Sequence, residues 1–127
     1  MKKDSNMRKV IGMGETILDI LFKNRQPVAA VPGGSSFNAI ISTGRVGVPC
    51  HFIGSTGADE VGQMIVDFMH ANGVSTQYFE QTEEKSAVSL AFLDEAGDAH
   101  YSFYKPSVKC PGEKSHPAFA QDDVLLF

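Results

Sequence analysis

The carboxylate of Asp19 lies inside a segment that is otherwise apolar. Residues 17–22 read Ile-Leu-Asp-Ile-Leu-Phe, so burial of this segment would take one charged side chain with it. Burying a carboxylate without partners is strongly unfavourable, because the ionised group loses its hydration. Asp19 therefore either faces water from the edge of a strand or is held for a ligand that donates hydrogen bonds to it. The residues alone leave both interpretations open.

A glycine-rich stretch follows at residues 32–47, with the sequence Pro-Gly-Gly-Ser-Ser-Phe-Asn-Ala-Ile-Ile-Ser-Thr-Gly-Arg-Val-Gly. Gly33 and Gly34 allow the backbone to turn tightly and to approach a ligand closely. One of the two serines that follow is predicted to cap a helix, and Asn38 falls in its first turn, where its amide can point back to the glycines. Free N–H groups and the helix dipole would suit a polar or anionic ligand. The alternative is an ordinary turn in front of a core helix.

Two common nucleotide-binding loops are excluded by the sequence. The Walker loop requires Gly-Lys followed by Ser or Thr, and that triplet does not occur. The dinucleotide fingerprint requires G-x-G-x-x-G, and residues 12–17 lack its last glycine. We therefore expect groups that recognise hydroxyls rather than a loop that encloses phosphates.

The composition favours one modest domain in a reducing compartment. The chain has 127 residues, of which 43% are hydrophobic, enough for one core but too few residues for two well-developed domains. A net charge of −4 makes nucleic acid and anionic membranes poor partners, and no apolar run approaches the roughly 20 residues that span a bilayer. Cys50 and Cys110 lack metal-ligand spacing. We expect a cytoplasmic protein without a metal site.

The apolar periodicity predicts alternating strands and helices. Short apolar runs at residues 10–13 and 51–54 are typical of buried parallel strands. A helix with one buried stripe is predicted to follow the glycine pair, and a second helix is predicted at residues 61–69 with Asp59 as its N-cap. Strand, helix, strand, helix with short connections is the pattern of a parallel sheet covered by helices. The sequence therefore predicts an α/β fold, with residues 54–59 as a second glycine-rich loop.

Two other segments do not fit that pattern. Residues 87–92 alternate with a period of two, a turn is predicted at 94–98, and a second strand returns, so residues 86–105 are predicted to form an antiparallel hairpin. Such a hairpin would project from the parallel core as a flap. Residues 124–127 are apolar and are predicted to form a buried strand, which indicates the N-terminal portion of something larger.

Several motifs occur in an order and spacing that point to one family. They are Gly12-x-Gly14-Glu15-x-x-x-Asp19, Gly33-Gly34-x-x-x-Asn38, Gly44-Arg45-x-Gly47, Gly54-x-x-Gly57-x-Asp59-x-x-Gly62, and Asp94-x-x-Gly97 leading to Phe103-Tyr104-Lys105. Over about residues 9 to 105, the chain resembles the ribokinase-like (PfkB) carbohydrate kinases, and within them the fructokinase-like members. The resemblance is to the N-terminal portion of these enzymes.

The resemblance implies a Rossmann-like α/β fold in which residues 1–127 form the N-terminal part of one ribokinase-like domain. Residues 17–31 and 86–105 would form a small antiparallel β lid, with a sugar bound between lid and core, and the lid could pair with a second lid in a homodimer. ATP and Mg²⁺ would be bound by the C-terminal half and by no residue of this chain. The catalytic aspartate belongs to a Gly-x-Gly-Asp motif of that half, so no catalytic residue is expected here. Asp98 follows a glycine but precedes a strand, and is predicted to be a hairpin-turn residue.

The resemblance also implies a set of substrate-binding residues. Asp19 would accept hydrogen bonds from two sugar hydroxyls, because ionised carboxylate oxygens only accept. Gly33 and Gly34 would direct backbone N–H groups to the sugar, and Asn38 both donates and accepts. Lys105 occupies a lid position where fructokinase-like members often carry arginine, and lysine does not reproduce the planar fork of arginine. The identity of the sugar therefore stays open.

The favoured interpretation is the sugar-binding half of a fructokinase-like enzyme that transfers the γ-phosphoryl group of ATP to a sugar hydroxyl. Two alternatives stay open. The chain could be a non-catalytic fragment that binds sugar or dimerises through the lid. It could also belong to a related kinase that acts on a nucleoside or on 2-keto-3-deoxygluconate.

Overall fold

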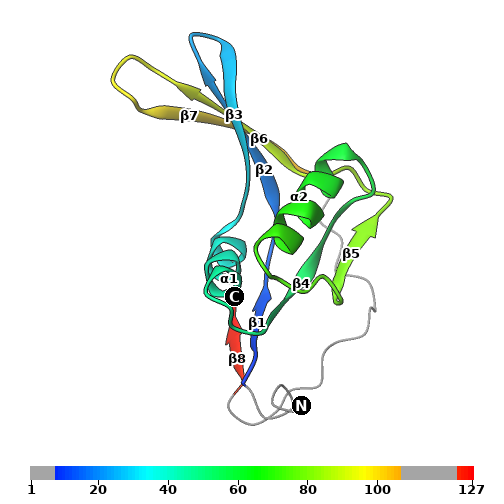
Figure 1. The fold of residues 1–127 in the computed structure, drawn as a ribbon. Helices are drawn as coiled ribbons and strands as arrows, with labels where there is room; N and C mark the ends of the chain where they lie inside the picture. Colours follow the sequence, from blue (N-terminus) through cyan, green and yellow to red (C-terminus); the bar gives the residue numbers. More distant parts are fainter. Residues whose placement is uncertain (1–7, 107–122) are drawn as a thin grey trace.

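The computed structural model describes residues 8–106 and 123–127, in which eight strands and two helices form two sheets (Figure 1). Cys110 and nearly all of the proline-rich segment 106–123 lie outside the described residues. The core sheet has four parallel strands in the order β5-β4-β1-β8. Its strands are β1 (Val10–Met13), β4 (Cys50–Gly57), β5 (Phe79–Thr82) and β8 (Val124–Leu126). The predicted parallel core is confirmed.

Helices α1 (Ser35–Arg45) and α2 (Glu60–Ala71) pack against one face of the core sheet. The predicted stripe of α1 is buried, and its Phe37 ring meets the Phe52 ring of β4 edge to face, with 5.5 Å between centroids. Cys50 lies in the same cluster, where burial raises the pKa of its thiol. The core cluster comprises Phe37, Ile40, Ile41, Cys50, Phe52, Ile65, Met69, Val74 and Phe79. Because the cluster includes residues of both helices and of β4 and β5, it packs both helices onto the core sheet.

Two local predictions are wrong. Helix α1 has Gly34 rather than a serine as its N-cap residue, and Ser36 Oγ donates instead to the carbonyl oxygen of Met13 at 2.8 Å. That hydroxyl therefore ties the first turn of α1 to the end of β1. Residues 54–57, predicted as part of a loop, instead continue β4, because they pair with β5 in parallel register.

The C-terminal strand forms as predicted, but its side chains are not buried. Strand β8 pairs in parallel with β1, and Val124 and Leu125 are 45% and 41% exposed. An edge strand pairs along only one of its sides, so it gains less cover than a central strand. The apolar run therefore predicts the strand correctly, and burial of the strand in a longer protein stays a prediction.

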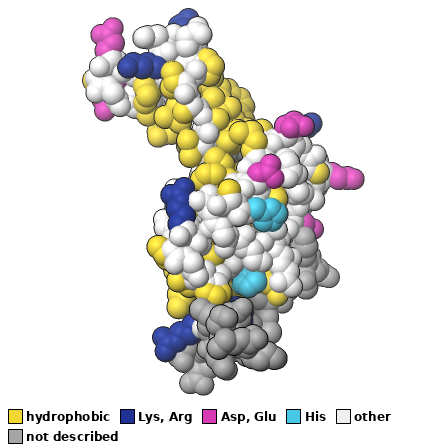
Figure 2. Space-filling view, viewed as in Figure 1, with side chains coloured by type: hydrophobic (Ala, Val, Ile, Leu, Met, Phe, Trp, Pro, Cys, Tyr) yellow, Lys and Arg dark blue, Asp and Glu magenta, His cyan; other side chains and the backbone are white. Residues whose placement is uncertain are grey.

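A second sheet, the lid sheet, projects from the core (Figure 1). It has the order β3-β2-β6-β7 and consists of β2 (Ile17–Lys23), β3 (Gln26–Gly33), β6 (Val88–Leu93) and β7 (Ala99–Tyr104). The predicted hairpin is present as β6 and β7, and β2 and β3 form another. The two hairpins join through parallel pairing of β2 with β6, so the lid sheet is mixed rather than wholly antiparallel. Apolar side chains gather on its visible face (Figure 2).

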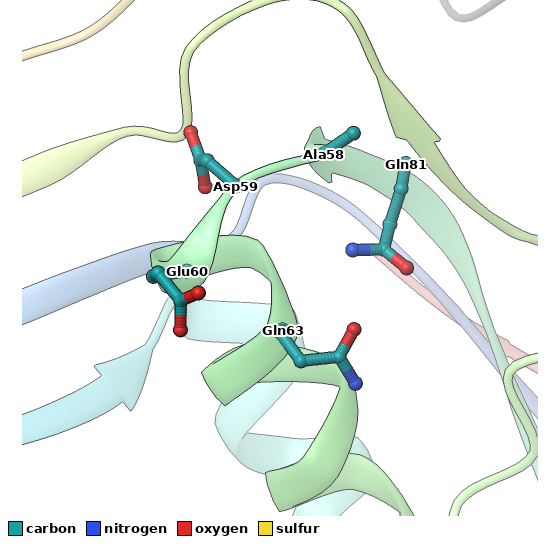
Figure 3. A pocket seen from close by; sticks show the side chains of 5 residues that line it. All are labelled: Ala58, Asp59, Glu60, Gln63 and Gln81. Atoms are coloured by element: carbon teal, nitrogen blue, oxygen red, sulfur yellow. The ribbon is translucent and has the colours of Figure 1, made fainter.

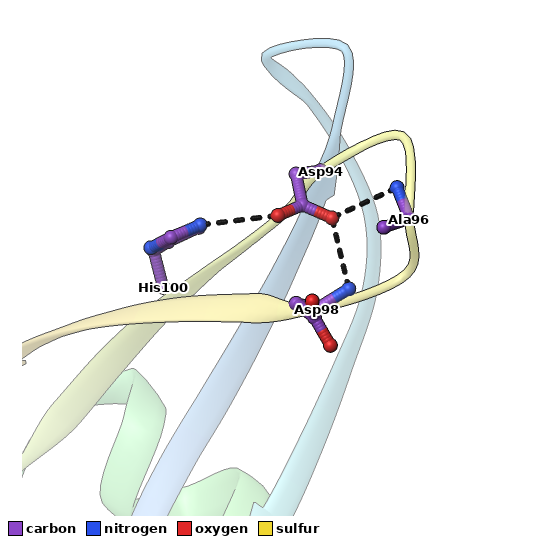
Figure 4. Close-up of polar contacts among 4 residues, drawn as sticks. All are labelled: Asp94, Ala96, Asp98 and His100. Atoms are coloured by element: carbon purple, nitrogen blue, oxygen red, sulfur yellow. Dashed lines mark hydrogen bonds and ion pairs between the residues drawn. The ribbon is translucent and has the colours of Figure 1, made fainter.

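The tip of the second hairpin is organised by one carboxylate (Figure 4). Asp94 Oδ1 accepts hydrogen bonds from the N–H groups of Ala96 and Asp98, each at 2.9 Å, and Oδ2 lies 3.2 Å from His100 Nε2. Gly97 has a φ of 86°, which closes the turn in the left-handed region. Asp98 is therefore a hairpin-turn residue, as predicted.

Titration of Asp94 should control the order of this tip. The N–H of Asp98 lowers the pKa of the Asp94 carboxyl, and His100 and the N–H of Ala96 act in the same direction against desolvation. Because the folded pKa lies below the unfolded one, the turn is stabilised above about pH 4 and loses that stabilisation as the pH falls through the folded pKa. NMR titration of the Ala96 and Asp98 amide shifts should give a midpoint below about 3.9. A midpoint at or above that value, or the same profile in Asp94→Ala, would contradict this origin of the tip's order.

Candidate functional site

Asp19 lies in the middle of the lid sheet, not at its edge. Strand β2 is flanked by β3 and β6, and Asp19 is opposite Val31 on one side and Ser89 on the other. Ser89 is fully buried, and its hydroxyl donates a hydrogen bond to Asp19 Oδ1. Among the described residues, no hydrogen bond to the other carboxylate oxygen, Oδ2, is formed. The edge-exposed interpretation of Asp19 is therefore wrong, and one carboxylate oxygen keeps its capacity to accept.

Two of the other predicted site residues lie beside this carboxylate. A Cβ atom added to Gly33 would be 2.9 Å from Asp19 Oδ2 and 3.9 Å from Asn38 Oδ1. Gly33 ends β3, and Asn38 lies in the first turn of α1, where its N–H donates to the Gly34 carbonyl at 2.8 Å. The short connection from β3 to α1 thus brings the carboxylate of Asp19, the backbone of Gly33 and the side-chain amide of Asn38 close together. Any β-carbon at position 33 would crowd the carboxylate.

The structure shows a packing reason for the lack of a side chain at Gly34, and its predicted role in ligand binding stays a prediction. Its φ of 135° is a conformation that residues with side chains rarely adopt. A Cβ atom at this position would lie 2.4 Å from the carbonyl oxygen of Glu15. The lack of a side chain is therefore required by close packing against the chain that leaves β1.

A cleft of about 940 Å³ opens where β1 and β4 end, below the lid sheet. In open α/β sheets, ligands bind outside the carboxyl ends of the strands. From the lid, the cleft is lined by Ile17, Ala87, Phe103 and Lys105, and from the α1 entrance by Gly34. Its acidic lining residues, Glu15, Glu80, Glu83 and Glu84, outnumber its two lysines, Lys85 and Lys105.

The Asp19 group lies on the lid face that lines this cleft. Side chains two residues apart on a strand share a face, so Asp19 shares the face of Ile17. Ser89 likewise shares the face of Ala87, and it is opposite Phe103 on β7. Asp19 and Ser89 are not themselves part of the cleft lining but continue its lid wall by one step along each strand.

Lys105 lies in the cleft wall and is not brought to Asp19. Its ammonium is 3.3 Å from Glu15 Oε2 and 5.5 Å from the centre of the Phe103 ring. Both charged side chains remain well exposed, so the ion pair is screened by water. In the part of the chain that the structure describes, Lys105 forms no hydrogen bond with Asp19, Gly33 or Asn38.

Sequence reasoning assigned no role to two residues of this region. Ser89 supplies the internal donor to Asp19, and Glu15 pairs with Lys105 across 90 residues of sequence. The sequence does contain a signal for Ser89. Its hydroxyl is the one polar side chain in the apolar segment 87–92, just as the carboxylate of Asp19 is in segment 17–22. Glu15 belongs to a quoted motif, but nothing in the sequence indicates that the lid returns over it.

A smaller hollow of about 570 Å³ lies at the N-terminus of α2 (Figure 3). It is lined by Ala58, Asp59, Glu60, Gln63 and Gln81. The Asp59 carboxylate is already engaged there, because it accepts a hydrogen bond from the Gly62 N–H at 2.8 Å. The larger cleft, with the Asp19 group above it, is therefore the candidate site.

Comparison with known proteins places the chain in a family. Residues 7–126 match the pfkB family carbohydrate kinases. The chain is 36% identical over 85 residues to a ribokinase of Bacillus subtilis, covering 67% of this chain and 27% of that protein. It is 28% identical over 98 residues to aminoimidazole riboside kinase of Salmonella typhimurium, covering 76% and 31%. The chain thus spans about a third of the length of the curated relatives it matches.

The fold agrees with the sequence match. A crystal structure of fructokinase from Xylella fastidiosa with bound ATP has a TM-score of 0.66 to this chain, at 24% identity, over 78% of this chain and 33% of that one. Neither α1 nor α2 has the length and apolar character needed to cross a membrane, and these are the helices of the described residues. The family inferred from the ordered motifs is confirmed, and the chain belongs to the pfkB family of carbohydrate kinases.

Proposed function

We propose that this chain is the sugar-binding part of an ATP-dependent carbohydrate kinase that phosphorylates a sugar hydroxyl. The observation that carries the proposal is the convergence of Asp19, Gly33 and Asn38 at the junction of lid and core. Lys105 and Gly34 line the cleft directly below. A polyhydroxylated ligand at this junction would meet the acceptors of the lid and the amide of α1 together.

The chemistry of these groups fits vicinal hydroxyls. An ionised carboxylate has only acceptor sites, and each sugar hydroxyl brings one donor. Ser89 uses part of the capacity of Asp19 Oδ1, which leaves Oδ2 directed toward Gly33 and the start of α1. The Asn38 amide can donate to one ligand oxygen and accept from another hydroxyl. Charge-assisted hydrogen bonds of this kind are short and strong, so they would orient the sugar.

ATP and Mg²⁺ would be bound, in this proposal, by the two thirds of the kinase that this chain does not match. ATP would supply the γ-phosphoryl group, and the metal would neutralise the phosphate charge. The residues of this chain would bind and orient the sugar and restrict water at the lid. We also propose a cytoplasmic location, since Cys50 is a free buried thiol of the kind found in reducing compartments.

Neutral sugars suit the cleft better than sugar acids. The ammonium of Lys105 already pairs with Glu15, and the cleft lining carries more acidic than basic side chains. A carboxylated substrate such as 2-keto-3-deoxygluconate would meet net negative charge. A riboside is the second candidate, because a relative of this chain is an aminoimidazole riboside kinase. A fragment that binds sugar without catalysis stays a further alternative.

Replacing Asp19 by Asn should weaken sugar binding without unfolding the chain. Asn keeps the shape but loses the charge and one acceptor, and we expect an affinity loss of at least thirtyfold, or about 2–4 kcal/mol. NMR titration of the purified chain with D-fructose, D-ribose and a riboside measures the effect, and Asp98→Asn in the exposed lid turn is the matched control. Equal affinity in wild type and Asp19→Asn would rule out the assignment.

The 127-residue chain by itself should not turn over ATP. Its one Gly-Asp pair in a turn, Gly97-Asp98, leads into β7 and not into a helix whose N–H groups could stabilise a transferred phosphoryl group. We expect no sugar-dependent ADP release in a coupled assay with ATP, Mg²⁺ and the same sugars. Turnover at ordinary kinase rates of roughly 1–100 s⁻¹ would show that the chemistry lies in this chain.

We also propose that the lid pairs with the lid of a second copy. Val31, Tyr101 and Phe103 lie on the Asp19 face of the lid sheet with 46%, 58% and 60% of their surface exposed. The rings of Tyr101 and Phe103 stack with 5.8 Å between centroids, so they form one exposed aromatic patch. Analytical ultracentrifugation should show a dimer that the double change Tyr101→Ser and Phe103→Ser converts to monomer. A monomeric wild type at high micromolar concentration would contradict this pairing.

A further inference from the structure

The segment that connects the core sheet to the lid sheet packs directly against the backbone at the end of β4. Residues 83–87 connect β5 of the core sheet to β6 of the lid sheet and pass over the end of β4. A Cβ atom on Gly57 would lie 2.5 Å from the Glu84 carbonyl oxygen and 2.6 Å from the Ser86 nitrogen. No larger residue fits under this crossing without moving the backbone.

Asp59, the N-cap residue of α2, binds the crossing segment through hydrogen bonds from Ser86. Asp59 Oδ1 accepts from the N–H of Gly62 at 2.8 Å, which is the predicted N-cap bond. The same carboxylate also accepts from Ser86, through the hydroxyl at 2.5 Å to Oδ1 and through the backbone N–H at 3.0 Å to Oδ2. One side chain therefore holds both the helix N-terminus and the segment that enters the lid.

The hydroxyl of Ser86 extends this connection to β4. It accepts a hydrogen bond from the Gly57 N–H at 2.9 Å and lies 3.0 Å from Thr56 Oγ1. Ser86 is buried, so these bonds form away from bulk water, where an unpaired polar group would be costly. Core strand, core helix and lid segment meet at this single serine.

Ser86 is only three residues before Ser89, the donor to Asp19. An extended chain rises about 3.3 Å per residue, so there is little slack between the two serines. The Ala87 carbonyl also accepts from the Leu18 N–H at 3.0 Å, which fixes the first pairing of β6 with β2. Holding Ser86 therefore sets which residue of β6 comes opposite Asp19.

We propose that Asp59 and Ser86 are positioning residues that set the register of the lid over the ligand site. Their action on ligand binding rests on the proposed function of Asp19, whereas the anchoring of β6 does not. Burial tends to raise the pKa of Asp59, but the hydrogen bonds from Ser86 and Gly62 outweigh it and lower the pKa. Asp59 is thus ionised at neutral pH and accepts from all its partners.

Asp59→Asn separates anchoring from capping. Asn is as good an N-cap as Asp, so α2 should keep its stability. Its amide has one acceptor oxygen, and with that oxygen on Gly62 the NH₂ group faces the N–H of Ser86, donor against donor. We expect amide hydrogen exchange in Val88–Leu93 to rise at least tenfold, with exchange in α2 unchanged, and sugar affinity to fall in parallel. Asp67→Asn, which alters an exposed carboxylate that accepts from Gln63 on α2, is the matched control and should change neither.

Ser86→Ala provides an independent variant, because it removes the hydroxyl and keeps the helix cap. It should reproduce the faster exchange of β6, and combining it with Asp59→Asn should add less than the sum of the two changes. Faster exchange in α2 and β6 alike would overturn the proposal, since Asp59 would then be a cap and nothing more. Unchanged sugar affinity in Asp59→Asn would also overturn it. Faster β6 exchange in a chain whose wild type binds none of the sugars would support the anchoring and reject the proposed function.

Discussion

The half-buried carboxylate of Asp19 lies in the middle of an apolar strand, and the candidate site is built around the hydrogen bonds it can accept. Asp19 cannot reach water from a strand edge, because β2 has neighbours on both sides. Ser89 gives it one internal donor, and Gly33 leaves the space next to Oδ2 without a side chain. Oδ1 thus has a donor within the chain, and a ligand hydroxyl could supply one for Oδ2.

The N-terminus of each helix is a place where the lid meets the core. At α1 the chain passes from β3 through Gly34, whose backbone packs against Glu15. At α2 the Asp59 carboxylate binds the segment that begins β6. Helix N-termini offer unpaired N–H groups, so they suit both capping carboxylates and polar ligands. The same local chemistry thus serves to join the two sheets and to leave a polar cleft between them.

The sequence predicts the elements better than their contacts. The stripe of α1, the Asp59 cap and the 86–105 hairpin follow from local periodicity and turn residues, and they are present in the structure. The pairing of β2 with β6 joins residues about 70 positions apart, so no local pattern reveals the mixed lid sheet or the Ser89 donor. The contact between Lys105 and Glu15 could not be predicted either. It depends on where the whole lid places the end of β7. The roles of Asp19, Gly33, Gly34, Asn38 and Lys105 in binding stay predictions.

The structure of the chain with D-fructose or D-ribose bound tests the role of Asp19 most directly. We expect Asp19 Oδ2 to accept a hydrogen bond from a sugar hydroxyl at about 2.5–3.0 Å, with the Asn38 amide in contact with the same ligand and the Ser89 bond retained. A sugar bound in the cleft without contact to the Asp19 carboxylate, or one bound in the hollow beside Gln63 and Gln81, would contradict that role.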